Sequence, residues 1–135
     1  MKSDYTAACS KQSLAMIRDF VSVQLKSMEV QESMAHQLVL AIDEACANSI
    51  IHHHSCDGTS SIRVSISRHE NTLTIELIDH GSAFPIDEYK PRDLQEIIRD
   101  RTKGGLGIFL INKIMDKVEV VQGAQEFAYR FTKYL

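Results

Sequence analysis

Three polar side chains are spaced four residues apart in the segment DEACANSIIHHH (43–54), namely Glu44, Asn48 and His52. Side chains at this spacing lie along one stripe of a helix. A carboxylate, an amide and an imidazole can all ligate a metal ion, so a metal site is one interpretation. A solvated polar face would show the same pattern, so the stripe alone does not decide what the segment does.

Two further segments have the features of a ligand site. Asp79-His80-Gly81 follows the alternating stretch TLTIELID (72–79), so an acidic acceptor would stand at a strand end beside exposed backbone. An Asp-x-Gly sequence also commonly starts an ordinary turn. The second segment, TKGGLGI (102–108), places three glycines directly before an apolar helical stretch.

Glycines at the start of a helix leave backbone N–H groups uncovered, and together with the helix dipole these groups favour a phosphate. An exposed helix end contributes only about 0.3–1 kcal/mol, so an anion site needs further donors. Arg101 and Lys103 are placed to supply them. The segment fits neither the Walker A pattern nor the complete GxGxxG of a dinucleotide-binding unit.

The consecutive histidines His52, His53 and His54 suggest a metal ion at first sight. Successive side chains on a helix point about 100° apart, so these three cannot converge on one ion without distortion. The metal interpretation of this run is therefore the weaker one.

Hydrophobic periodicity places these segments on a set of helices and strands. The expected elements are an edge strand at 3–9, a helix at 11–28 with Ser10 as N-cap, a helix at 32–54, a hairpin of strands at 61–68 and 72–79, a helix after Gly105, and strands at 118–122 and 126–134. Residues 80–104 hold both prolines and many charges, with a weak helix at 93–99, and we expect a lid at about 84–104. This order predicts an α+β two-layer sandwich, with a mixed, mostly antiparallel sheet and helices on one face.

Length and composition predict one soluble globular domain spanning residues 1–135. The chain is 44% hydrophobic and 24% charged, and its net charge of −3 gives no electrostatic reason to expect nucleic acid as a partner. No apolar run approaches the roughly 18 residues of a membrane span, and the N-terminus lacks a signal-peptide pattern. We expect a cytoplasmic protein with no membrane contact, and three free thiols at Cys9, Cys46 and Cys56.

The segments together, in this order, resemble the ATP-binding domain shared by gyrase, heat-shock chaperones, histidine kinases and mismatch-repair ATPases. More narrowly, the chain is similar to the anti-sigma-factor serine/threonine kinases. The motifs that carry this resemblance are IRDFV (17–21), DEACANSIIHH (43–53), DHGSAF (79–84) and GGLGIFLINKIMDKVEV (104–120). The resemblance extends over nearly the whole chain, and finding four such motifs in the correct order by chance is difficult.

The resemblance implies the cofactors ATP and Mg²⁺ and a role for each motif. Asn48 would ligate the Mg²⁺ that bridges the phosphates, and Glu44 would be the general base. Asp79 would accept a hydrogen bond from the adenine amino group, with Gly81 allowing the base to approach. The phosphates would be held by Lys103, Gly104, Gly105, Leu106 and Gly107.

The family's partners follow from the same resemblance. The chain would be an ATP-binding anti-sigma factor that sequesters a sigma factor, phosphorylates an anti-sigma-factor antagonist on serine or threonine, and forms a homodimer. One alternative is a regulatory switch of the same fold that binds ATP without protein kinase activity. The family's Gly-Thr pair on the last strand is replaced here by AQEFA (124–128), which leaves room for that alternative. A sensor histidine kinase fits less well, because the chain has no room for a dimerising phosphoacceptor helix pair.

Overall fold

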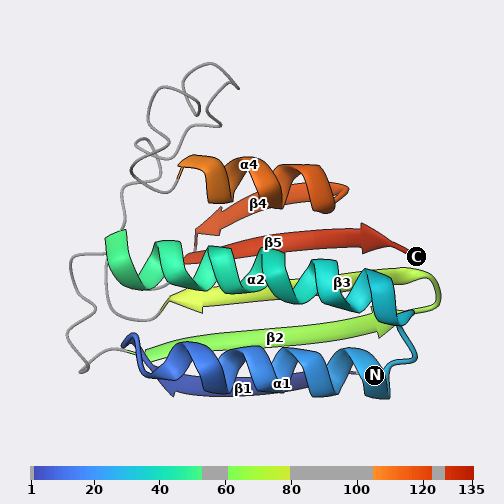
Figure 1. The fold of residues 1–135 in the computed structure, drawn as a ribbon, viewed down its shortest axis with the longest axis horizontal. Helices are drawn as coiled ribbons and strands as arrows, with labels where there is room; N and C mark the ends of the chain where they lie inside the picture. The colour runs from blue at the N-terminus through green and yellow to red at the C-terminus, as the bar shows by residue number, and fades with distance from the viewer. Residues whose placement is uncertain (1, 53–60, 80–104, 123–126) are drawn as a thin grey trace.

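Five strands form one open sheet whose spatial order is β1-β2-β3-β5-β4 (Figure 1). The computed structural model describes residues 2–52, 61–79, 105–122 and 127–135. The strands are β1 (Lys2–Ala8), β2 (Ser61–His69), β3 (Thr72–Asp79), β4 (Lys117–Gln122) and β5 (Phe127–Tyr134). All four strand pairings are antiparallel, so the sheet is not mixed in the described part of the chain. The expected hairpin, edge strand and C-terminal strand pair are confirmed.

Three helices in the described part of the chain pack on one face of this sheet, which confirms the expected two-layer α+β architecture (Figure 1). They are α1 (Ser13–Ser27), α2 (Glu32–His52) and α4 (Gly105–Ile114). In Figure 1, α2 lies between α1 and α4, and it contacts both. The expected lid at 84–104, the weak helix at 93–99 and the end of the 32–54 helix lie outside the described residues.

The start of α1 differs from the expectation. Ser10 is not the N-cap, because the backbone first makes a turn in which Ser13 N donates to Ser10 O at 3.1 Å and Leu14 N donates to Lys11 O at 3.2 Å. The helix therefore begins at Ser13, and Gln12 is its cap residue without a capping hydrogen bond from its side chain. The Ser10 and Ser13 hydroxyls contact each other instead, at 3.3 Å.

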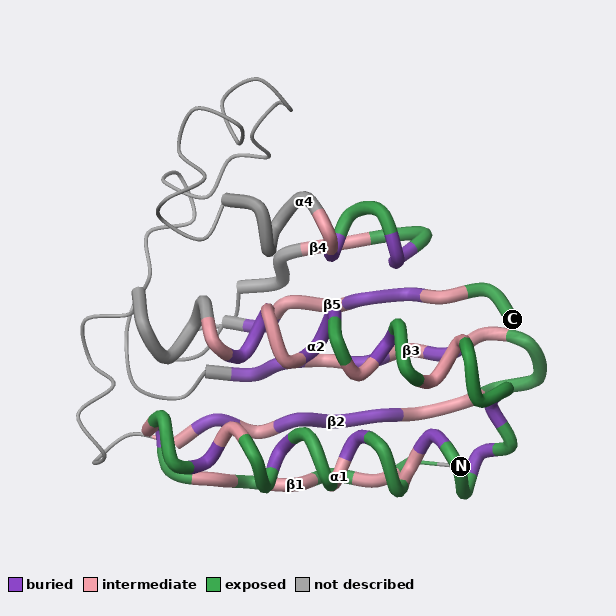
Figure 2. Tube along the Cα trace, in the orientation of Figure 1, coloured by how far each residue is buried: buried purple, intermediate pink, exposed green. Residues whose placement is uncertain are grey.

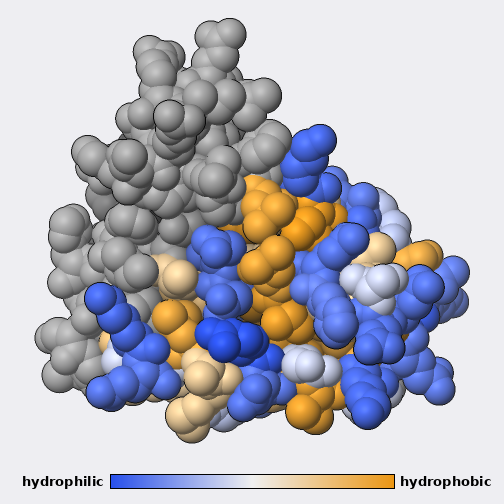
Figure 3. All heavy atoms as spheres, in the orientation of Figure 1, coloured by the Kyte–Doolittle hydropathy of each residue, from blue (hydrophilic) through white to orange (hydrophobic). Residues whose placement is uncertain are grey.

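The core lies between the sheet and the helices, as the buried segments of both layers in Figure 2 show. Each strand contributes alternate residues to it, since successive side chains of a strand point to opposite faces. On the central strand β3 these are Leu73, Ile75 and Leu77, all at most 2% exposed. On the helical side of the molecule, Figure 3 shows apolar side chains gathered in a band among hydrophilic ones. This two-layer core fixes the positions of the helix and strand ends that carry the candidate site.

Candidate functional site

Two adjacent acidic residues on α2 lie on opposite flanks of the helix. The buried residues Ile42 and Ala45 precede and follow them, and each step turns the helix by about 100°. Asp43 lies toward α1, where its Oδ1 accepts a hydrogen bond from Arg18 Nε at 3.2 Å. Glu44 therefore lies on the other flank, toward α4.

The Glu44 carboxylate is half-buried, and no residue of the described chain donates a hydrogen bond to it or forms an ion pair with it. A carboxylate in this position, attached to a rigid helix and unpaired, is able to accept a proton from a bound hydroxyl group. Its neighbour Asp43 is already paired with Arg18, so the two acids are suited to different tasks.

The structure places Asn48 and His52 on α2, one and two turns after Glu44. One turn of an α-helix advances the chain by about 5.4 Å, so Glu44 and Asn48 are attached side by side to one rigid element. The orientations of the Asn48 and His52 side chains lie outside the described residues, as do His53 and His54. In the part of the chain that the structure describes, no group of three His, Cys, Asp or Glu side chains could hold a metal ion.

Asp79 is the last residue of β3, the central strand of the sheet. Its backbone is paired with Ile62 of β2 on one side and with Phe127 of β5 on the other. The predicted strand end is therefore confirmed for Asp79. Gly81 falls outside the described residues.

The glycine turn, Gly105–Gly107, forms the first residues of α4. This confirms that the glycines open a helix, which leaves their backbone N–H groups without partners inside the helix. Lys103 and Gly104 lie outside the described residues. Buried residues near the end of α4, Ile111 and Ile114, anchor the helix in the core.

Three of these segments meet at one end of the molecule. Figure 1 shows that the C-terminal end of α2, the end of β3 and the start of α4 all lie at its left-hand end. The sequence separates Glu44 from Gly105 by sixty residues, and the sheet order together with the α2–α4 contact brings their elements together. The helix that carries Glu44 and Asn48, the strand that ends at Asp79 and the N-terminus of α4 thus come together at this end.

The thiol of Cys46 on α2 is buried in the core. Burial raises the pKa of this thiol to about 12, and the Asp43 carboxylate acts in the same direction. Cys46 is thus a neutral core side chain and not a nucleophile at ordinary pH. The expectation of free thiols holds for Cys46 but is wrong for Cys9, which is disulfide-bonded in the structure. The expectation rested on the odd number of cysteines, the lack of a CxxC motif and a reducing compartment.

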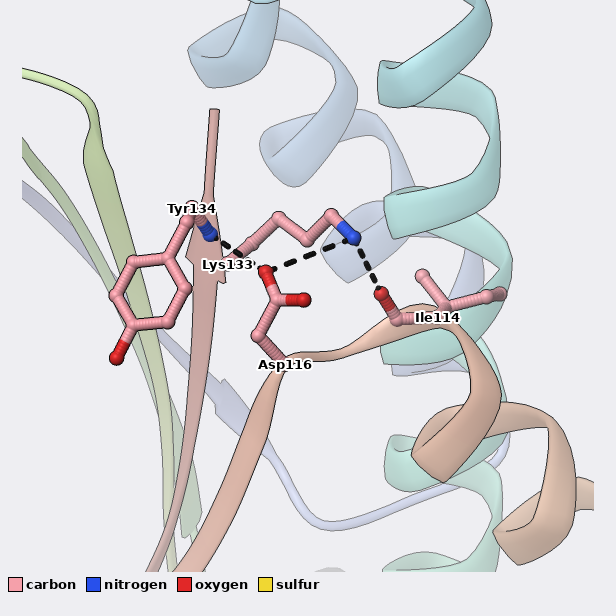
Figure 4. A network of polar contacts seen from close by, with 4 residues as sticks. All are labelled: Ile114, Asp116, Lys133 and Tyr134. Atoms are coloured by element: carbon pink, nitrogen blue, oxygen red, sulfur yellow. Dashed lines mark hydrogen bonds and ion pairs between the residues drawn. The ribbon is translucent and has the colours of Figure 1, made fainter.

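Sequence reasoning missed a polar network at the other end of α4, which we call the α4 clamp (Figure 4). Lys133 Nζ donates to Ile114 O, the carbonyl of the last helical residue, at 2.9 Å. The same ammonium lies 3.6 Å from Asp116 Oδ2, which also accepts a hydrogen bond from Tyr134 N at 2.7 Å. No local motif marks these four residues, because they are joined only by the pairing of β4 with β5.

Comparison with known proteins identifies the family of this arrangement. The model of the histidine kinase-like ATPase domain matches residues 7–133. The chain belongs to this family. This confirms the predicted fold and the resemblance drawn from the four motifs, and it makes ATP the expected ligand of the grouped elements.

Curated relatives of this ATPase-domain chain include serine-protein kinases. The serine-protein kinase RsbW of Halalkalibacterium halodurans is 38% identical over 85 residues, which are 60% of this chain and 51% of that protein. RsbW of Bacillus subtilis is 30% identical over 103 residues, 73% of this chain and 63% of that protein. The chain thus spans about half to two thirds of the length of these relatives.

Two solved structures share the fold. The RsbU and RsbW domains of Rv1364c from Mycobacterium tuberculosis match with a TM-score of 0.71 at 15% identity, covering 100% of this chain and 32% of that one. The SiaB–SiaC complex from Pseudomonas aeruginosa matches with a TM-score of 0.61 at 13% identity, covering 96% and 88%. No described helix of this ATPase domain is long and apolar enough to cross a membrane.

Proposed function

We propose that this chain is a cytoplasmic anti-sigma factor that binds ATP with Mg²⁺ and phosphorylates an anti-sigma-factor antagonist on serine or threonine. The observation that carries the proposal is Glu44, a half-buried carboxylate on the flank of α2 that faces α4, with no partner among the described residues. Similarity to the RsbW serine-protein kinases supports the same activity.

The roles of the site residues follow from their chemistry. Glu44 accepts the proton of the attacking hydroxyl while the hydroxyl oxygen forms its bond to the γ-phosphorus of ATP. The bond from that phosphorus to the β–γ bridging oxygen breaks, and ADP leaves with the electron pair. A positioned base of this kind contributes typically ~10²–10⁴-fold to the rate.

The remaining residues bind and orient the nucleotide. Asp79 accepts from the adenine amino group and Gly81 lets the base approach, while the glycine turn, with Lys103 and Gly104, holds the phosphates through backbone N–H groups and the positive helix end. Asn48 offers the neutral amide oxygen that suits Mg²⁺. When bound, the ion neutralises charge that develops on the phosphates.

The partner assembly is part of the same proposal. A homodimer would present the surface that sequesters one sigma factor, and ATP would favour that complex until the antagonist is phosphorylated. Light scattering on the purified protein at micromolar concentration tests the dimer, and a particle of monomer mass would contradict it.

Transfer of radiolabelled phosphate tests the kinase activity. The protein is incubated with Mg-ATP labelled at the γ-phosphate and with its co-purified native partners, and Glu44→Gln serves as the matched control. We expect label on serine or threonine of a second protein with the parent and little with the variant. Binding of Mg-ATP without any transfer would instead favour the regulatory switch that lacks kinase activity.

A further inference from the structure

The α4 clamp holds one end of a short helix whose other end is the glycine turn. Lys133 Nζ neutralises the C-terminal carbonyl end of α4 by donating to Ile114 O at 2.9 Å, and its side chain is only 17% exposed. A cation at a helix C-terminus is stabilising, and more so when water is largely excluded. The clamp therefore acts on the helix itself and not only on the adjacent strand.

The sheet holds the clamp in place from the other side. Asp116 N donates to Thr132 O at 3.0 Å, and Asp116 Oδ2 accepts from Tyr134 N at 2.7 Å, so Asp116 is bonded to the backbone of β5 on both sides of Lys133. The chain from Ile114 to Asp116 is thus fixed to β5 directly after the helix ends. Figure 4 shows Lys133 reaching from β5 to the end of α4.

This arrangement makes the clamp control the direction of α4. The helix has ten residues, and at 1.5 Å per residue its two ends are about 15 Å apart. A tilt of about 5° at the clamped end would move the glycine turn by about 1 Å, and a misplacement of that size can cost about 10²-fold in rate. Packing of α4 against α2 limits sliding, and the clamp is a polar contact that joins the end of α4 to the sheet.

We infer that Lys133, held by Asp116, is a positioning residue for the phosphate-binding end of α4. The inference rests on the proposed function, because it takes the glycine turn to hold the phosphates of ATP. It assigns to Lys133 an effect on the triphosphate of the nucleotide and none on the adenine, which is bound at the end of β3.

The test compares two ligands that share the adenine and differ in the phosphates. Lys133→Met removes the ammonium and keeps most of the apolar stem, while Lys133→Arg keeps the charge and a donor. Lys117→Met is the matched control. Lys117 on the neighbouring strand β4 loses the same charge, but among the described residues its ion pair is with Glu119, at 3.8 Å and largely in solvent. Calorimetry gives the Kd of Mg-ATP, and displacement of bound Mg-ATP by adenosine gives the Kd of adenosine.

We expect Lys133→Met to weaken the binding of Mg-ATP at least about tenfold. This is the effect of losing one hydrogen bond between the displaced glycine turn and a charged phosphate. Adenosine affinity should stay at the parent value, Lys117→Met should resemble the parent for both ligands, and Lys133→Arg should restore most of the Mg-ATP affinity. Equal weakening of both ligands would show a general loss of structure and would overturn the inference. Loss of Mg-ATP affinity in Lys117→Met would also overturn it, since total charge would then be the cause.

Two outcomes separate this inference from the proposed function. A parent protein that binds no Mg-ATP would overturn the proposed function, and the inference with it. A parent that binds Mg-ATP while Lys133→Met binds equally well would overturn the inference alone.

If Lys133→Met does not fold, Asp116→Asn decides, because it keeps an oxygen acceptor for Tyr134 N but removes the ion pair. A selective loss of Mg-ATP affinity in that variant supports the inference, and unchanged affinity contradicts it.

Discussion

Adjacent residues on one helix can have different roles when the helix turns them toward different neighbours. Asp43 forms an ion pair with Arg18 of α1, whereas Glu44 on the opposite flank has no partner in the described chain. An exposed ion pair such as Arg18–Asp43 contributes at most about 1 kcal/mol, so its main effect here is to hold α1 beside α2. The proposed base is therefore the acid that the structure leaves unused.

Cys46 provides a prediction about reactivity at the residue scale. Its pKa is raised by burial to about 12, so the thiol is protonated in the native protein at pH 8. We expect iodoacetamide at pH 8 to leave Cys46 unmodified in the native protein and to alkylate it in urea, as peptide mass spectrometry would detect. Rapid alkylation of Cys46 under native conditions would contradict the buried position.

The same thiol makes stability depend on pH in a defined direction. Between the ordinary pKa of 9.0 and the folded value of about 12, the folded chain keeps a proton that the unfolded chain releases. The contribution of Cys46 to the free energy of unfolding is therefore fully present below pH 9 and falls as pH rises above it. We expect urea titrations to show that, between pH 8 and pH 10.5, the free energy of unfolding falls more steeply for the parent than for Cys46→Ala. Parallel pH profiles for the two proteins would refute this.

At the scale of elements, the amphipathic helix α2 offers two leucines for a direct comparison. Leu38 is fully buried in the core, whereas Leu40 is 46% exposed. We expect Leu38→Ala to lower the free energy of unfolding by about 2–5 kcal/mol through lost burial and a residual cavity. Leu40→Ala should change it by less than about 0.5 kcal/mol, because little is buried there. Urea titrations of both variants check the pair, and similar losses would mean that the burial of α2 is misassigned.

Elements with a clear period were predictable from sequence, and their ends and pairings were less so. The alternation of β2 and β3 and the apolar spacing of α1, with Ile17, Val21 and Leu25 buried, identified them directly. The choice of Ser10 as N-cap failed because a preceding turn competes for the same backbone groups. The entirely antiparallel pairing of the described strands could not be derived, since strand order depends on contacts between distant segments.

For the whole molecule, the sequence indicated the site motifs but not the contacts that position them. Glu44, Asn48, Asp79 and the glycine turn could be named because their types and order match a family. The α4 clamp could not be named, because Lys133 and Asp116 meet only through the register of β4 and β5. The Cys9 disulfide was missed because no CxxC motif in the sequence marks it.

Adenine nucleotides should stabilise the whole domain more than guanine nucleotides do. A ligand that binds only the folded state adds RT ln(1 + [L]/Kd), which is about 2.7 kcal/mol at a hundredfold excess over Kd. We expect Mg-ATP and Mg-ADP to raise the melting temperature, and Mg-GTP to raise it little, because guanine presents no amino group where Asp79 would accept one. Differential scanning fluorimetry compares the three, and equal shifts with ATP and GTP would remove the proposed adenine contact of Asp79.

The most direct test of the nucleotide site separates the roles of Glu44 and Asn48, one helical turn apart on α2. Calorimetric titration with Mg-ATP, followed by the phosphate-transfer assay, is performed on the parent, Glu44→Gln and Asn48→Ala. Glu44→Gln keeps the shape of the side chain and removes the base, so it should bind Mg-ATP within a few-fold of the parent and transfer little phosphate. Asn48→Ala should bind Mg-ATP poorly, because Mg²⁺ would lose the amide oxygen that is proposed to hold it. Binding and transfer equal to the parent in both variants would contradict the account and leave α2 with an ordinary solvated polar face.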